Sequence, residues 1–175
     1  MKKKILALIA GGIVLASCVA TNAMASDGTV KFAGSLTADA CKVDAGSQNM
    51  TVDMGEVATS SFVAGAGTKS SPTRFDIKLT DCPATVTGAA LKFDGTSDST
   101  NPSLVGLDSD SVATGVGIEI SDSTGTPVVL HSASTVYPLA EGNNTLSFVS
   151  RYVSTAAAPT AGSANATSQF TLNYQ

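Results

Sequence analysis

The sequence has no tryptophan, one histidine, three cysteines and little charge. Of its 175 residues, 14% are charged and 5% aromatic, while 43% are hydrophobic. This balance is too apolar and too weakly charged for an intrinsically disordered chain, so we expect one folded domain. Ten Lys and Arg residues less the three at positions 2–4 leave seven against 14 Asp and Glu, a net charge of −7. Such an acidic chain argues against nucleic acid as a partner.

The single histidine, His131, restricts the chemistry that the chain can carry. Any Ser-His-Asp arrangement or His-bearing metal site would depend on it, so we expect no catalytic residue, metal site, cofactor or small-molecule substrate. Two segments resemble ligand loops only in part. Residues 65–70 lack the spacing and following helix of a phosphate-binding loop, and residues 108–110 lack the third acidic ligand, glycine and glutamate of a calcium loop.

The first 25 residues are typical of an export signal peptide. Lys2 to Lys4 form a positive segment, residues 5–16 an apolar run, and Ala23-Met24-Ala25 a cleavage site. The apolar run is too short for a permanent membrane anchor, so we expect an exported mature chain that begins at Ser26. Residues 15–18 also fit a lipoprotein signal, which would lipidate Cys18, and this alternative stays open.

Removal of the signal peptide leaves Cys41 and Cys82 as an even pair of cysteines. Export to an oxidising compartment favours a disulfide between them. Closing a loop of about 41 residues would remove denatured-state entropy worth about 4 kcal/mol. A zinc site would need further Cys or His ligands that the chain does not have. We therefore predict a Cys41–Cys82 disulfide.

Apolar residues of the mature chain recur with period two, which is typical of half-buried strands. Turn-forming clusters separate several of these runs, and residues 156–166, broken by Pro159 and Gly162, are expected to form a loop. The predicted strands are residues 28–36, 50–52, 75–79, 91–93, 116–120, 128–130, 146–153 and 170–174. The predicted turns are residues 94–95, 124–127 and 141–144. This pattern predicts an all-β, immunoglobulin-like β-sandwich.

The two ends of the mature chain carry its most unusual features. The last predicted strand runs to Gln175, with no residues left for a closing strand, and an isolated strand precedes Cys41. One face of that isolated strand consists of Gly28, Val30, Phe32, Gly34 and Leu36. Spacing alone leaves two alternatives open, because the strand could pair within its own sheet or join the sheet of another molecule.

Several motifs, in their order and spacing, resemble one family over essentially the whole mature chain. These motifs are residues 28–41, residues 78–82, Gly125, the 141–144 turn, Arg151-Tyr152, Gly162 at the fourteenth position from the end and the penultimate Tyr174. Together they resemble the pilin subunits of chaperone–usher (type 1-like) fimbriae, most of all a major shaft pilin.

The resemblance implies an incomplete immunoglobulin-like β-sandwich that lacks its last strand. Its parts would be a signal peptide (1–25), an N-terminal donor-strand extension (26–39) and a pilin domain (40–175). The acceptor groove and C-terminal motif would include Gly162, Phe170, Leu172 and Tyr174. A periplasmic chaperone would fill this groove first, and the extension of the next subunit would fill it in the fimbrium. The implied partners are other copies of the chain, other pilin subunits, the chaperone and an outer-membrane usher.

Strand donation has a clear physical basis. A sandwich without an edge strand exposes unpaired backbone groups and core side chains, and a strand from another chain satisfies both. Burial of Val30, Phe32 and Leu36 would contribute roughly 4 to 9 kcal/mol before ordering costs. The result is a non-enzymatic structural subunit at the cell surface. The alternatives are a fimbrial adhesin or carbohydrate-binding module, or a minor adaptor pilin.

Overall fold

The computed structural model describes residues 28–34 and 40–175. The chain divides into two units, residues 1–36 and residues 37–175. The predicted signal peptide, Cys18 and Leu36 lie outside the described residues. In the first unit, residues 28–34 form neither helix nor strand, and the side chains of Val30 and Phe32 are 76% and 94% exposed.

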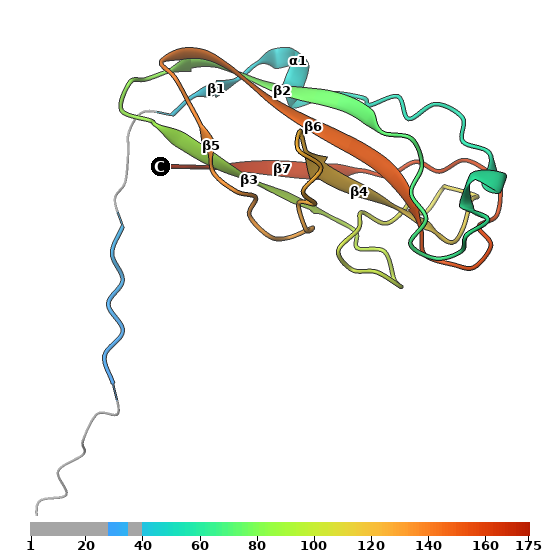
Figure 1. Ribbon diagram of the computed structural model, residues 1–175. Helices are drawn as coiled ribbons and strands as arrows, with labels where there is room; N and C mark the ends of the chain where they lie inside the picture. Colours follow the sequence, from blue (N-terminus) through green and yellow to red (C-terminus); the bar gives the residue numbers. More distant parts are fainter. Residues whose placement is uncertain (1–27, 35–39) are drawn as a thin grey trace, which may run out of the picture. The chain divides into compact units, whose positions relative to one another are not determined.

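The second unit is a sandwich of two antiparallel sheets (Figure 1). Its strands are β1 (Lys42–Val43), β2 (Thr73–Cys82), β3 (Gly88–Gly95), β4 (Val116–Asp122), β5 (Tyr137–Pro138), β6 (Gly142–Ser154) and β7 (Ser168–Tyr174). One sheet has the strand order β1-β2-β6-β4 and the other the order β5-β3-β7. The described helices are α1 (Ala45–Gln48) and the 3-10 turn Thr59–Phe62, and neither is long enough to cross a membrane.

Period-two alternation explains why these segments form strands with one buried face. In β2, Ile77 and Leu79 are fully buried, while Asp76 and Lys78 are exposed. The inward faces of the two sheets meet around Phe148, whose ring lies 5.6 Å from that of Phe75 and 5.3 Å from that of Phe93. The prediction of an all-β immunoglobulin-like sandwich is confirmed.

The structure differs from the prediction at segments that have no neighbouring strand, or only a very short one, to pair with. Residues 128–130 are not a strand, because this segment has no continuous neighbour to pair with. The amides of Val128, Leu130 and the following His131 each donate one hydrogen bond, to the carbonyls of Ile120, Ser103 and Phe93, which lie in three different segments. Residues 50–52 and 28–34 likewise form no paired strand. The two-residue strands β1 and β5 are too short to show any periodicity in the sequence.

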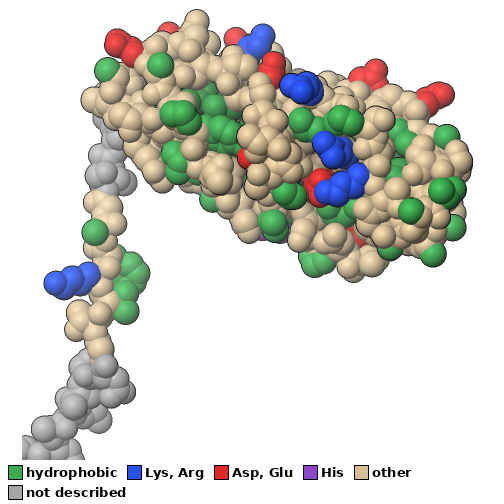
Figure 2. All heavy atoms as spheres, in the orientation of Figure 1, with side chains coloured by type: hydrophobic (Ala, Val, Ile, Leu, Met, Phe, Trp, Pro, Cys, Tyr) green, Lys and Arg blue, Asp and Glu red, His purple; other side chains and the backbone are tan. Residues whose placement is uncertain are grey.

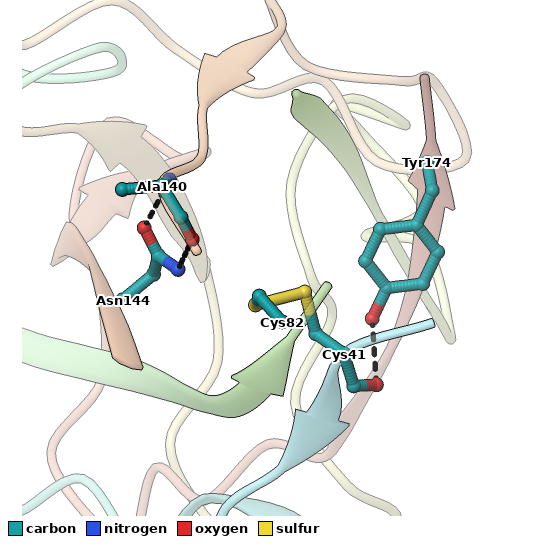
Figure 3. The surroundings of a disulfide bond; sticks show 5 residues. All are labelled: Cys41, Cys82, Ala140, Asn144 and Tyr174. Atoms are coloured by element: carbon teal, nitrogen blue, oxygen red, sulfur yellow. Dashed lines mark hydrogen bonds between the residues drawn. A yellow bond between two sulfur atoms is a disulfide. The ribbon is translucent and has the colours of Figure 1, made fainter. Parts of the chain in front are cut away.

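The predicted disulfide between Cys41 and Cys82 is confirmed (Figure 3). It joins the start of the sandwich to the end of β2, next to the short pairing of β1 with β2. Nearby, the side-chain amide of Asn144 bonds both the amide and the carbonyl of Ala140, which fixes the connection into β6 (Figure 3).

Candidate strand-binding groove

The last strand, β7, has one unpaired edge. It pairs with β3 from Ala89–Tyr174 to Gly95–Ser168, and no strand of the described residues pairs with its other side. Its side chains Phe170, Leu172 and Tyr174 face the core but stay only half-buried. In a closed sandwich an adjacent strand would cover them. The missing strand therefore belongs beside β7.

The segment facing β7 is also unpaired. Met50, Val52 and Met54 are half-buried, whereas Thr51 and Asp53 are exposed, which is the side-chain alternation of a strand. Its backbone makes no hydrogen bond to the backbone of any other described residue. The predicted strand at residues 50–52 thus has the expected pattern but lacks a neighbour to pair with.

A groove of about 720 Å³ separates these two rims. One rim is residues 50–55, and the other is residues 164–168 with Phe170. Its floor comes from both sheets, with the apolar Phe75, Ile77, Phe93, Val105, Ile118 and Ile120 beside the polar Asp108, Ser150 and Tyr152. A largely apolar floor between the unpaired backbone of residues 50–55 and the free edge of β7 fits an extended peptide strand better than a compact ligand, because such a strand can satisfy both.

The structure places the four predicted groove and C-terminal residues in different surroundings. Phe170 lines the groove, and Leu172 and Tyr174 continue the same face of β7 beyond it. The Tyr174 hydroxyl donates a hydrogen bond of 3.1 Å to the Cys41 carbonyl (Figure 3), and burial raises the pKa of this phenol. The end of β7 is therefore fixed next to the disulfide.

Gly162 lies outside the groove lining and packs against a neighbouring loop. A Cβ at this position would lie 2.8 Å from both the Ala113 nitrogen and the Val112 Cβ, and its φ of +150° is one that side chains rarely adopt. Glycine at this position lets the segment before β7 approach the loop at residues 112–113 closely.

Asp108, which belongs to a segment without the full ligand set of a calcium loop, has a structural role. Its Oδ1 accepts a hydrogen bond of 3.1 Å from the Thr167 amide, and its Oδ2 accepts one of 2.8 Å from the Thr167 hydroxyl. These bonds anchor the chain where it enters β7 at the rim of the groove. A separation of 59 residues leaves no local sequence signal for this contact.

The N-terminal extension shows the alternation expected of a donor strand. Among residues 28–34, Val30 and Phe32 fall on one set of alternating positions and Lys31 on the other. In Figure 2 both hydrophobic and basic side chains of this segment are exposed. The predicted donor residue Leu36 lies outside the described residues.

The structure brings the single histidine next to Asp94 and Ser97. His131 Nδ1 lies 2.9 Å from Asp94 Oδ1, and its Nε2 lies 3.2 Å from Ser97 Oγ. Lys92 binds the other Asp94 oxygen at 2.9 Å, and its hydrogen bond, followed by that of His131, lowers the pKa of Asp94. The histidine side chain is half exposed, so this arrangement resembles a surface ion-pair network.

Among the described residues, no group of three or more His, Cys, Asp or Glu side chains is placed to hold a metal ion.

Comparison with known proteins gives consistent matches. The family model described as "Fimbrial protein" matches residues 28–175. The type-1 fimbrial protein A chain of Escherichia coli is 42% identical over 186 residues, and the alignment covers 100% of both proteins. The fimbrial subunit type 1 of Salmonella typhimurium is 42% identical over 154 residues, covering 85% of this chain and 83% of that protein.

Two solved structures share the architecture. An antigen and type I fimbria protein of Burkholderia pseudomallei superposes with a TM-score of 0.62 at 38% identity, over 79% of this chain and 91% of the other. The P pilus rod subunit PapA superposes with a TM-score of 0.67 at 25% identity, over 77% of this chain and 99% of the other.

Proposed function

Because this chain belongs to the fimbrial protein family, it is a structural subunit of a surface pilus, and we propose that it polymerises by strand donation. In this proposal, the N-terminal extension of one copy occupies the groove between residues 50–55 and β7 of the next copy. The single observation that supports it most is a groove that lies between two unpaired backbone edges, residues 50–55 and the outer edge of β7. The alternating, exposed Val30 and Phe32 supply the complementary strand.

The direction of the donated strand follows from the sheet. Every strand pair of the sandwich is antiparallel, and antiparallel pairs are slightly more stable per residue than parallel ones. In the proposed register, a donor antiparallel to β7 has Phe32 opposite Phe170, Val30 opposite Leu172 and Gly34 opposite Ser168. Its backbone would pair antiparallel with β7 on one side and parallel with residues 50–55 on the other.

An uncovered groove is an aggregation hazard, so the subunit needs a temporary cover before assembly. We propose that a periplasmic chaperone supplies this cover and that an outer-membrane usher exchanges it for the next extension. Other copies of this chain and other pilin subunits are the proposed lasting partners. The proposed role involves no catalysis, cofactor, nucleic acid or small-molecule substrate.

The proposal is tested by supplying the missing strand within one molecule. A chain that begins at residue 40 and carries residues 26–39 after Gln175, joined by a flexible linker, should melt at a much higher temperature than the same chain without the added strand. The gain combines a new hydrogen-bond ladder with roughly 4 to 9 kcal/mol from burying Val30, Phe32 and Leu36. The matched control carries Phe32→Asp in the added strand. Equal melting temperatures with and without the added strand would show that the sandwich is already complete.

A further inference from the structure

Asp53 is the only charged residue on the two strand-like rims of the groove, residues 50–55 and β7. Its side chain is exposed, and its Oδ1 accepts a hydrogen bond of 2.9 Å from the Gly55 amide. None of the ion pairs among the described residues includes Asp53. The outward residues of β7 are the uncharged Gln169, Thr171 and Asn173. The strand-like rims of the groove thus carry one negative charge outside any ion pair, whereas the other acidic lining residue, Asp108, is hydrogen-bonded to Thr167.

Lys31 is the matching charge on the extension. Of the outward positions 29, 31, 33 and 35, it alone is charged. Its side chain is exposed and takes part in none of the ion pairs of the described residues. One unpaired cation on the donor and one unpaired anion on the acceptor would therefore meet if the two lie at similar depths in the groove.

Contacts across the sandwich place Val52 at the depth of Phe170, with Asp53 one residue beyond it. Ser150 donates a hydrogen bond of 3.0 Å to Met54 Sδ and pairs with Thr73, so Met54 lies level with Thr73. The preceding inward residue, Val52, is then level with Phe75, because the segment follows β2 in the opposite direction.

Phe75 also lies at the same depth as a residue of β7, on the other side of the core. Its ring lies 6.5 Å from that of Phe93, which pairs with Phe170. Val52 and Phe170 therefore face each other across the groove, and Asp53 lies one residue beyond this level, on the outer face.

A donor strand with Phe32 opposite Phe170 puts Lys31 beside Thr51, with Asp53 as its diagonal neighbour on the same face. Diagonal neighbours lie about 7–8 Å apart, which is within reach of a lysine side chain. We propose that Lys31 of one copy forms an ion pair with Asp53 of the next copy and thereby favours donors from this same chain. This inference rests on the proposed strand donation.

We expect the ion pair to affect which donor strand is accepted more than how tightly it binds. The pair is exposed to solvent, so it adds little to the apolar burial, but reversing one charge replaces attraction with repulsion. We expect Lys31→Glu or Asp53→Lys to lower the yield of assembled pili roughly two- to fivefold. The double variant restores the pair with opposite polarity and should assemble at the wild-type level. The single-variant defects should shrink in high salt, because ions screen exposed charges.

Co-expression gives the decisive measurement. In fibres formed by the wild-type chain and the Lys31→Glu/Asp53→Lys double variant, each with its own epitope tag, same-tag neighbours should outnumber mixed neighbours roughly two- to fivefold, because each mixed contact joins like charges. Mixing the two single variants should yield shared fibres, because each cross-contact joins opposite charges. Thr29→Glu and Glu56→Lys are the matched controls, since the first introduces and the second reverses a charge at an exposed position next to, but outside, the proposed contact.

Free mixing of the double variant with the wild-type chain, or a double variant that assembles no better than the single ones, would overturn the ion pair. A Phe32→Asp variant separates this failure from failure of strand donation. If Phe32→Asp blocks assembly while the charge variants have no effect, donation stands and the Lys31–Asp53 contact is wrong. If Phe32→Asp also assembles normally, strand donation itself is wrong.

Discussion

At the scale of single residues, Tyr174 links the end of β7 to the start of the domain. Its hydroxyl donates to the Cys41 carbonyl, so Tyr174→Phe removes one hydrogen bond and little else. We expect the free energy of unfolding of the strand-complemented chain to fall by about 0.5–1.5 kcal/mol, measured by denaturant titration. Asn173→Ala, an exposed change on the same strand, should stay within about 0.5 kcal/mol. Equal effects of the two variants would show that the hydroxyl bond contributes nothing specific.

The tyrosines predict how stability depends on alkaline pH. Burial raises the pKa of Tyr137, Tyr152 and Tyr174 above the ordinary value of 10.0, because the phenolate is poorly solvated inside the sandwich. The unfolded chain then loses these protons at lower pH than the folded chain. Stability should be fully present below about pH 10 and fall as pH rises through the raised values.

Unfolding midpoints between pH 8 and pH 11 measure this dependence. Tyr152→Phe should flatten the alkaline loss, because it removes one of the three groups. An unchanged midpoint across this range would contradict the assignment.

At the scale of elements, the donor strand is expected to tolerate changes on one face only. Phe32→Asp puts a carboxylate into an apolar groove at a cost of several kcal/mol, so it should abolish assembly while leaving the subunit's own fold intact. Thr29→Ala, on the outer face, should assemble nearly normally. The assay compares the amount of pili on cells with the amount of folded subunit in the periplasm. Loss of the folded subunit itself in Phe32→Asp, as for the core variant Leu79→Asp, would place the strand in its own sheet.

The long strands could be predicted from the sequence because they have one continuous buried face. The alternation of Phe75, Ile77 and Leu79 predicts β2, and Phe170, Leu172 and Tyr174 predict β7. The same period-two pattern at residues 50–52 predicted a strand, but the structure leaves that segment without a pairing neighbour. Local sequence specifies which side chains can face a core, whereas strand pairing depends on which other strand lies next to the segment.

The details of the groove could not be predicted from the sequence, because they also depend on which segments lie side by side. Phe170 was predicted as a lining residue, but its opposite rim and its floor come from residues far away in the chain. The contact between Asp108 and Thr167 and the contact between Gly162 and residues 112–113 both join loops across about 50 residues or more. No periodic pattern or short motif records such a contact, so only the folded chain reveals it.

At the scale of the whole molecule, the disulfide should be the main covalent restraint on the denatured chain. It closes a loop with a sequence separation of 41. Replacing Cys41 and Cys82 together with serine should lower the free energy of unfolding by about 4 kcal/mol, measured on the strand-complemented chain. The native exported protein should show no titratable thiol and should change its electrophoretic mobility on reduction. Two reactive thiols in the native protein would contradict the bond.

The position of Cys41 also decides how a pulled fibre carries tension. In a polymer joined by extensions, the load enters each domain where its own extension ends, at Cys41. The first strand beyond that point, β1, has only two residues and two pairing partners, so it would peel from the sheet at low force. The disulfide passes the load past β1 into the ten-residue β2, which lies between β1 and β6. The disulfide therefore prevents β1 from being pulled off the sheet under load. Fibres whose disulfides have been reduced should extend at lower force in optical-tweezer measurements.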